Sequence, residues 1–251
     1  MTHELWFTAI LNGLFGQSVT ALLDMLARIP HLAFVRPADP LHPIPNYVAG
    51  EILVFLVIVV GALILRSRLS VENPGKLQTA MEAYLQFNHG LVDDVIGHGG
   101  RRYVAMIGTL GLFILLCNIE GLVPTLVTPT ATVVVPLGCS VVVFLHYNYH
   151  GFRVKGIRGY LRHLSGPMVA IAPLFFVVEL FSNFLRMLSL TARLWANMLA
   201  GVTLPDVFGS IVPVGVPALF MALHVFESFL QAYVFMILPA LYISLATSEE
   251  H

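Results

Sequence analysis

Two arginines lie in the middle of a long apolar stretch, where a charged side chain needs a partner or a function. Residues 168–200 are mostly apolar but contain Arg186 and Arg193. An arginine at the centre of a bilayer helix costs about 2.5–3.5 kcal/mol on insertion scales. At 100° per residue, the polar set in this stretch falls within an arc of about 80° on one helix face. Its members, with one leucine, are Glu179, Asn183, Arg186, Leu190, Arg193 and Asn197.

The sequence offers the two arginines different partners. Glu179 lies seven residues before Arg186 on the same face, so we expect these two to form ion pairs with each other or with a neighbour. The alternative is that Glu179, Asn183, Arg186 and Asn197 belong to a proton path. The acidic residue nearest to Arg193 in sequence is Asp206, beyond the expected end of the helix. A membrane charge without an internal partner indicates a functional role, so Arg193 is the leading candidate for chemistry.

A second polar set occupies the last apolar run and follows helical spacings of three and four. Its members are His224, Glu227, Ser228 and Gln231. A histidine, a glutamate and a glutamine on one helix face in a bilayer are typical of a water-accessible proton path. Glu120, with Asn118 beside it at the end of an earlier run, is a candidate to extend that path outward. The alternative for Glu120 is a solvated residue at the membrane surface.

His146 and His150 have a spacing that two metal ligands on a helix could use. A metal centre needs three or four ligands, so we interpret their HYNYH segment as a His/Tyr belt at the membrane interface. Cys117 and Cys139 lie inside apolar runs and are expected to be buried free thiols. The sequence contains no Walker-type loop, nucleophile elbow or CxxC pair. We therefore expect no metal, no cofactor and no enzyme activity of the chain on its own.

The elements that must position these side chains are membrane helices. Of the 251 residues, 57% are hydrophobic and 11% are charged, whereas about 25% charged residues is usual in a soluble domain. This composition leaves too little polar surface for a water-soluble globule and is too hydrophobic for a disordered chain. A net charge of −1 provides no basic surface for a nucleic acid. The sequence predicts an all-α polytopic membrane protein with the lipid bilayer as its solvent and no nucleic-acid partner.

Five apolar runs are long enough to cross a hydrocarbon core of about 30 Å. They are residues 48–65, 103–119, about 131–149, 168–200 and about 214–246. The last two exceed an upright helix, because roughly 33 residues rise about 50 Å. They must be steeply tilted or kinked, and we favour a steep tilt because residues 174–200 contain no Pro or Gly. Residues 201–213 are predicted to form the turn between them, and residues 150–167 a basic loop.

The N-terminal residues 1–47 are predicted to form a separate segment, and residues 48–251 a single membrane domain. Two short amphipathic stretches, 3–15 and 18–29, are interpreted as lying in the membrane interface rather than crossing it. Several prolines between residues 30 and 45 predict an irregular lead-in to the first span.

Basic residues in short loops predict the orientation. Residues 66–102 and 150–167 hold five and four of them, against two in residues 1–47 and none in 120–130 or 201–213. With five spans, this asymmetry places the N-terminus outside and the C-terminus in the cytoplasm.

Several motifs, in order along the chain, resemble subunit a of the F-type ATP synthase in its bacterial form. The most specific is LSLTARLWANMLAG at 188–201. The others are LFILLCNIEGLVP at 112–124, TPTA at 128–131, HVFESFLQAYVFMIL at 224–238 and the ending ALYISLATSEEH. The likeness covers about residues 103–251, and the first hundred residues match only in layout.

The resemblance also implies residue roles. It maps the family's essential arginine onto Arg193, its helix-stabilising asparagine onto Asn197 and its terminal-helix glutamine onto Gln231. His224 falls where some members have His and others Glu.

The chain departs from the family at residues that accompany these motifs. The family often has Glu or His at the position of Val202, as a partner for the residue at the His224 position. We expect Glu227 or Glu120 to supply the missing carboxylate. Thr132, Val134 and Pro136 also differ from the polar residues that are common in the family after the TPTA step, which argues against a channel role for the third span.

The resemblance implies a stator subunit of a rotary ATP synthase in the bacterial plasma (inner) membrane. Such a subunit packs against a ring of proteolipid subunits c and the peripheral-stalk subunit b. It forms two proton half-channels, presents Arg193 to the ring carboxyl groups and couples proton flow to ATP synthesis. The alternative is a proton-coupled secondary transporter, although five spans leave no inverted repeat. A membrane metalloenzyme would rest on His146 and His150 alone.

Overall fold

The structure is a computed structural model that describes residues 5–28, 42–97, 99–123, 126–164, 172–212 and 215–247. Every secondary-structure element in these ranges is a helix, which confirms the all-α prediction. The long ones are α1 Trp6–Ala27, α2 Asn46–Ser67, α3 Lys76–Ile96, α4 Val104–Glu120, α5 Val134–Leu164, α6 Ala172–Ile211 and α7 Val216–Thr247. Two short 3₁₀ segments, η2 Gly100–Tyr103 and η3 Pro129–Ala131, precede α4 and α5.

Five of the described helices are long and apolar enough to cross a membrane, as predicted. They are Trp6–Ala27, Asn46–Ser67, Gly100–Glu120, Leu174–Ile211 and Val216–Thr247. Four of them coincide with predicted spans, and the fifth is α1 in place of residues 131–149. The latter segment lies in α5, which begins only at Val134 and soon reaches the polar HYNYH sequence. Its crossing of the membrane stays a prediction.

The N-terminal segment differs from its prediction, because α1 is one continuous helix rather than two short stretches. The side chain of Asn12 accepts a hydrogen bond from the backbone N–H of Ile44 and donates one to its carbonyl, at 3.0 and 3.3 Å. Leu11, Ile44 and Ala49 form a small apolar core beside these bonds. These contacts hold α1 against the start of α2. Most of the predicted proline-rich lead-in, residues 29–41, lies outside the described residues.

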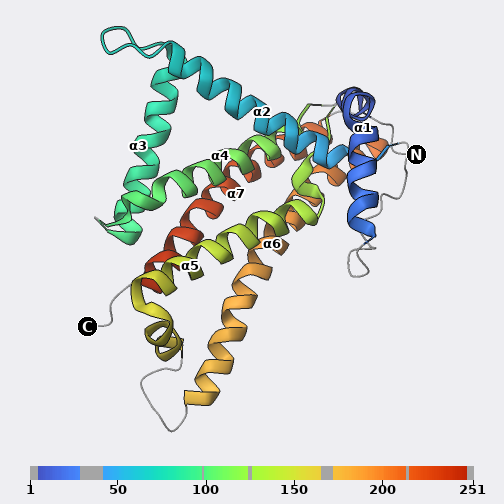
Figure 1. The fold of residues 1–251 in the computed structure, drawn as a ribbon. Coiled ribbons are helices and arrows are strands. Elements are labelled where there is room, and N and C mark those ends of the chain that lie inside the picture. Colours follow the sequence, from blue (N-terminus) through green and yellow to red (C-terminus); the bar gives the residue numbers. More distant parts are fainter. Residues whose placement is uncertain are drawn as a thin grey trace.

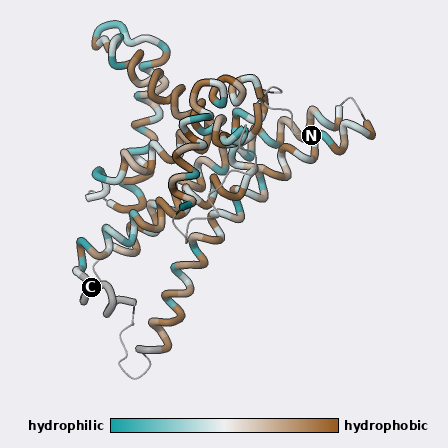
Figure 2. Tube along the Cα trace, turned by 45° about the vertical axis from the view of Figure 1, so that its right-hand side comes forward, coloured by the Kyte–Doolittle hydropathy of each residue, from teal (hydrophilic) through white to brown (hydrophobic). Residues whose placement is uncertain are grey.

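The core lies where α7 packs against α3, α4, α5 and α6. Ile114 of α4, Val143 of α5, Leu194 of α6 and Phe235 of α7 are all buried in it. Figure 1 shows α3 crossing between the ends of α2 and α4, while α4, α5 and α7 run in similar directions. Figure 2 shows that the loop between α2 and α3 is hydrophilic, whereas much of the length of the helices is apolar.

A partly buried hydrogen bond joins α3 to α4. The hydroxyl of Tyr84 donates to the carbonyl oxygen of Gly108 at 2.6 Å, and Asn88 is buried against the same glycine. Burial raises the pKa of Tyr84, so the phenol keeps its proton and continues to donate. The same hydroxyl lies 3.9 Å from Met236 Sδ of α7, so Tyr84 contacts both helices.

The last two helices are long, as predicted: α6 has 40 residues and α7 has 32, or about 60 Å and 48 Å at 1.5 Å per residue. The prediction that α6 ends at residue 200 is wrong, because the helix continues through Gly201 and Pro205 to Ile211. A membrane helix tolerates such a proline when neighbouring groups compensate for the lost backbone hydrogen bond. The predicted turn is therefore helical as far as Ile211, and Gly215, just before α7, has φ +90°. The tilt of both helices in a membrane stays a prediction.

The prediction of a basic loop at residues 150–167 is wrong for its described part, because residues 150–164 lie in α5. The helix α5 continues to Leu164 and changes direction at Gly156, which has φ 68° and ψ 164°. Only glycine adopts such a backbone conformation readily, so this residue allows a non-helical kink between the two helical parts of α5.

Candidate functional site

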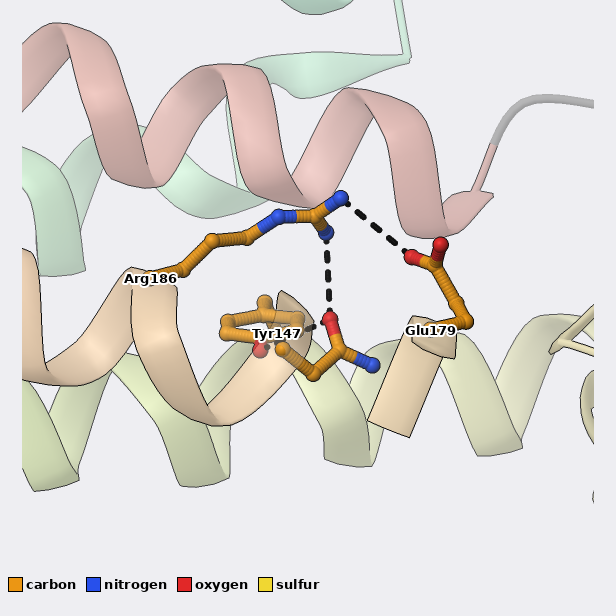
Figure 3. Close-up of polar contacts among 4 residues, drawn as sticks. Tyr147, Glu179 and Arg186 are labelled. Carbon is orange, nitrogen blue, oxygen red and sulfur yellow. Dashed lines mark hydrogen bonds and ion pairs between the residues drawn. The ribbon is translucent and has the colours of Figure 1, made fainter. Parts of the chain in front are cut away.

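Arg186 is held by a network within the chain (Figure 3). Its Nη2 atom lies 3.2 Å from Glu179 Oε1 in an ion pair, and its Nη1 atom donates to Asn183 Oδ1 at 3.0 Å. The hydroxyl of Tyr147 in α5 donates to the same Oδ1 atom at 3.2 Å. The guanidinium also lies 5.7 Å from the centroid of the Tyr242 ring in α7. The ion pair expected from the sequence is therefore present, and it compensates the charge of Arg186 inside the protein.

Arg193 lies two helical turns further along α6 and has a different environment. Its side chain is exposed, and it forms no hydrogen bond or ion pair with any other residue that the structure describes. Leu190 and Leu194 are buried on the inner side of the helix, whereas Ala192 and Ala196 are exposed beside Arg193. The guanidinium thus projects from a strip of small residues, and a partner for its charge must come from outside the described residues.

The polar face of α7 is mostly buried. His224, Ser228 and Gln231 are 2%, 0% and 0% exposed, whereas Glu227 is partly exposed. Ser228 donates a hydrogen bond to the carbonyl of His224 at 2.7 Å. Both ring nitrogens of His224 and both amide atoms of Gln231 have no hydrogen-bond partner among the described residues. Buried polar groups of this kind normally bind water or another group.

At the end of α4, Asn118 and Glu120 face different neighbours. Asn118 accepts a hydrogen bond from the hydroxyl of Thr130 at 2.6 Å, and its backbone lies next to His224. Glu120 faces α2, where a Cβ atom added to Gly50 would lie 3.1 Å from its Oε1 atom. Both carboxyl oxygens of Glu120 are buried without a partner in the described part of the chain. Of the two, Asn118 is the residue that contacts His224.

A cavity of about 420 Å³ lies between the loop after α4, the second half of α6 and the start of α7. Its lining includes Gly201, Val202 and Asp206 from α6 and His224 from α7. A side chain at position 201 would collide with the His224 ring, so only glycine allows this close approach. The cavity therefore gives the buried imidazole a route to the surface.

A second hollow, of about 580 Å³, opens beside Arg186. Ser182, Arg186 and Ser189 of α6 and Tyr242 of α7 supply its polar groups. Along α6, Arg193 falls between the two hollows, four residues after Ser189 and eight before Gly201. The exposed arginine thus lies along α6 between two hollows that both include residues of α6 and α7.

Sequence comparison decides the family. The profile described as "ATP synthase A chain" matches residues 48–244. The chain belongs to the ATP synthase A chain family. The ATP synthase subunit a of Koribacter versatilis (strain Ellin345) is 45% identical over 251 residues, covering 100% of both chains. That of Solibacter usitatus (strain Ellin6076) is 45% identical over 217 residues, covering 86% of this chain and 93% of its own. That of Aquifex aeolicus (strain VF5) is 38% identical over 188 residues, covering 71% and 87%.

This member of the ATP synthase A chain family is a multi-pass membrane protein with several apolar helices. Among the residues expected to form its site, Asn197 is half-buried on α6 next to the Arg193 turn. Neither Glu227 nor Glu120, the two residues expected to replace the missing carboxylate at Val202, lines the cavity at His224.

Two carboxylates were not among the site residues expected from the sequence. Asp206 lines the His224 cavity, but the expected end of the helix at residue 200 separated it from the polar face of α6. Glu51 lies in α2 and interacts electrostatically with Cys117, as does Glu120. Its position inside the apolar run 48–65 could have identified Glu51 as a candidate site residue from the sequence.

The paired histidines in α5 form part of an aromatic cluster. The ring centroids of His146 and His150 are 4.5 Å apart, and the Tyr103 ring lies edge-on at 6.2 and 4.8 Å from them. In the described ranges no three potential metal ligands come together. Cys117 and Cys139 are buried free thiols, as predicted.

Proposed function

We propose that this chain is the stator subunit of a bacterial F-type ATP synthase that presents Arg193 to the carboxyl groups of a rotating proteolipid ring. It forms two proton half-channels and so couples proton flow to ATP synthesis. Its partners are the ring of subunits c, the peripheral-stalk subunit b and the lipid bilayer. The N-terminus lies outside and the C-terminus in the cytoplasm. Beyond family membership, the observation that carries the proposal is the exposed guanidinium of Arg193 without an internal partner.

Elementary electrostatics explains what a fixed cation does at this place. A positive charge near a membrane carboxyl group favours its ionised form, so a proton leaves each ring site as it approaches Arg193. Arginine suits this role because it stays protonated at any working pH, whereas a lysine loses its proton readily in apolar surroundings. The same charge repels protons that would run directly between the half-channels. Each proton carries about 2.3 kcal/mol per 100 mV, so a leak would dissipate the gradient.

The two hollows support the assignment of half-channels. The cavity at His224 lies toward the α6–α7 turn, which this orientation puts on the outer side. The hollow at Arg186 and Tyr242 lies toward the C-terminal end of α7, on the cytoplasmic side. Arg193 lies between them along α6, which is where a barrier to direct proton flow belongs.

The test is Arg193→Ala in the complete synthase, reconstituted into vesicles. We expect proton-driven ATP synthesis to be abolished while the complex still assembles with its hairpin proteolipid, because Arg193 makes no hydrogen bond or ion pair within the described residues. Arg101→Ala, which removes an exposed arginine before α4, is the matched control and should synthesise ATP normally. Normal coupled synthesis by the Arg193→Ala complex would refute the proposal. Purification without any proteolipid would favour a secondary transporter instead.

A further inference from the structure

The cavity at His224 contains one carboxylate, and it is neither of the two that the sequence suggested. Asp206 lines this cavity together with Val202 and His224. Glu120 faces α2 instead, and Glu227 lies on α7 outside the lining. Among the described acidic residues of α4, α6 and α7, Asp206 is thus the one that lines the same hollow as the imidazole.

The continuation of α6 explains how Asp206 reaches this place. Residues four apart lie on one face of a helix, so Asp206 lies one turn beyond Val202 on the same side. The helix runs unbroken through Pro205 to Ile211. A carboxylate at 206 therefore faces the same hollow as a carboxylate at 202 would, one turn nearer to the outer end of the helix.

His224 has the environment of a residue that exchanges protons with this hollow. The residue is buried, with 2% of its surface exposed, yet neither ring nitrogen has a hydrogen-bond partner among the described residues. The absence of a side chain at Gly201 leaves room for the ring at the cavity wall. A hollow of about 420 Å³ has room for several water molecules, which occupy about 30 Å³ each in the liquid. Water can therefore connect Asp206 with the imidazole.

We propose that Asp206 is the proton-relay carboxylate of the outer half-channel and replaces the carboxylate missing at Val202. Its carboxylate takes a proton from outside water and passes it to water in the cavity. The imidazole of His224 accepts that proton at one nitrogen. It releases the proton from its other nitrogen toward the carboxyl group of the proteolipid ring. No charge accumulates, because Asp206 is again ionised and His224 again neutral after one transfer. The imidazole is then the other tautomer, and a flip of the ring about its Cβ–Cγ bond restores the first one before the next proton arrives. This inference rests on the proposed stator function and adds a residue to its outer path.

The first experiment measures ATP synthesis in vesicles carrying Asp206→Asn while the outer-side pH is varied. We expect a loss on the order of tenfold, since a positioned acid–base group contributes about 10²–10⁴-fold and water supplies part of the route. The dependence on outer pH should change and the dependence on inner pH should not. Adding Val202→Glu to this variant should restore the rate, because it returns a carboxylate to the same cavity. Asp94→Asn, on the exposed face of α3, is the control.

The outcomes separate this inference from the proposed function. Loss of synthesis in Arg193→Ala with a normal rate in Asp206→Asn would overturn the role of Asp206 and leave the stator function in place. A larger loss in Glu227→Gln or Glu120→Gln than in Asp206→Asn, or no rescue by Val202→Glu, would also overturn it. Normal synthesis in Arg193→Ala would instead remove the proposed function.

A second measurement is independent of activity. In the assembled synthase, Asp206→Cys should react with a membrane-impermeant thiol reagent added from the outer side, whereas the buried native thiols should not. Reaction from the inner side only, or no reaction, would contradict an outer cavity at this residue.

Discussion

The charged side chains in the first half of α6 have partners within the chain, whereas Arg193 in the second half has none among the described residues. In the first half, Arg186 bonds to both Glu179 and Asn183, and the Tyr147 hydroxyl of α5 donates a hydrogen bond to Asn183. In the second half, Arg193 is exposed without a partner in the described chain, and Asp206 faces a cavity. Both halves carry an arginine that a bilayer would otherwise exclude. The difference shows that position in an apolar helix does not by itself identify a functional charge.

The two arginines differ in whether their charge is compensated by partners inside the chain. A membrane charge with an ion pair and hydrogen bonds inside the chain needs no other partner, and its role can be structural. A charge without them must be compensated by another molecule or water. Because the two arginines share a helix and a residue type, substitutions at these two positions provide matched comparisons.

The largest difference in ATP-synthesis rate is expected between the lysine variants of the two arginines. Arg193→Lys should lower the rate of proton-driven ATP synthesis by roughly tenfold or more, the factor that about 1.4 kcal/mol of lost interaction produces. A lysine loses its proton more readily in apolar surroundings and lacks the planar guanidinium. Arg186→Lys should retain most of the rate, because a lysine can still pair with Glu179. Equal losses in the two variants, measured in the same vesicles, would contradict the distinction.

A smaller effect is expected at the glycine that accommodates His224. Gly201→Ala puts a methyl group against the imidazole, and overpacking of this kind costs about 1–3 kcal/mol. We expect slower proton uptake and a lower thermal midpoint of the complex. Gly209→Ala is the matched control on the same helix, since its Cβ atom would lie 3.5 Å from Pro217, an ordinary contact. If the two variants take up protons at equal rates, the close approach at Gly201 has no role in the path.

The smallest effect on ATP synthesis is expected in the first half of α6, where the charged side chains have partners within the chain. Tyr147→Phe removes one hydrogen bond to Asn183, which is worth about 0.5–1.5 kcal/mol. The Arg186 bond to Asn183 remains, so ATP synthesis should stay near the wild-type rate and only the thermal midpoint should fall slightly. A loss of synthesis comparable to that of Arg193→Lys would show that the first half of α6 also takes part directly.

The sequence predicted what local spacing determines. Glu179 and Arg186 pair as expected, because residues seven apart on a helix share a face. The apolar runs gave the long helices α6 and α7 for the same reason. The contact of Tyr147 with Asn183 joins residues 36 apart in sequence, and no local pattern contains it.

The errors came from reading Gly and Pro as helix ends. Gly201 and Pro205 suggested a turn, but Gly201 serves to admit the His224 ring and α6 continues past both. Packing against neighbouring helices decides such cases, and packing is not visible in the spacing of residues. The misplaced boundary also separated Asp206 from the helix face that brings it to the cavity.

The most direct test of the role of Arg193 is disulfide cross-linking between α6 and the proteolipid ring in the assembled synthase. Ala196→Cys places a thiol on the exposed strip beside Arg193, and Ala62→Cys places a matched thiol on the exposed face of α2. The partner cysteine is introduced next to the membrane carboxyl group of the proteolipid. We expect Ala196→Cys to cross-link and to stop ATP synthesis until the disulfide is reduced, and Ala62→Cys to form no link. Efficient cross-linking at Ala62 with none at Ala196 would contradict the claim that Arg193 faces the ring.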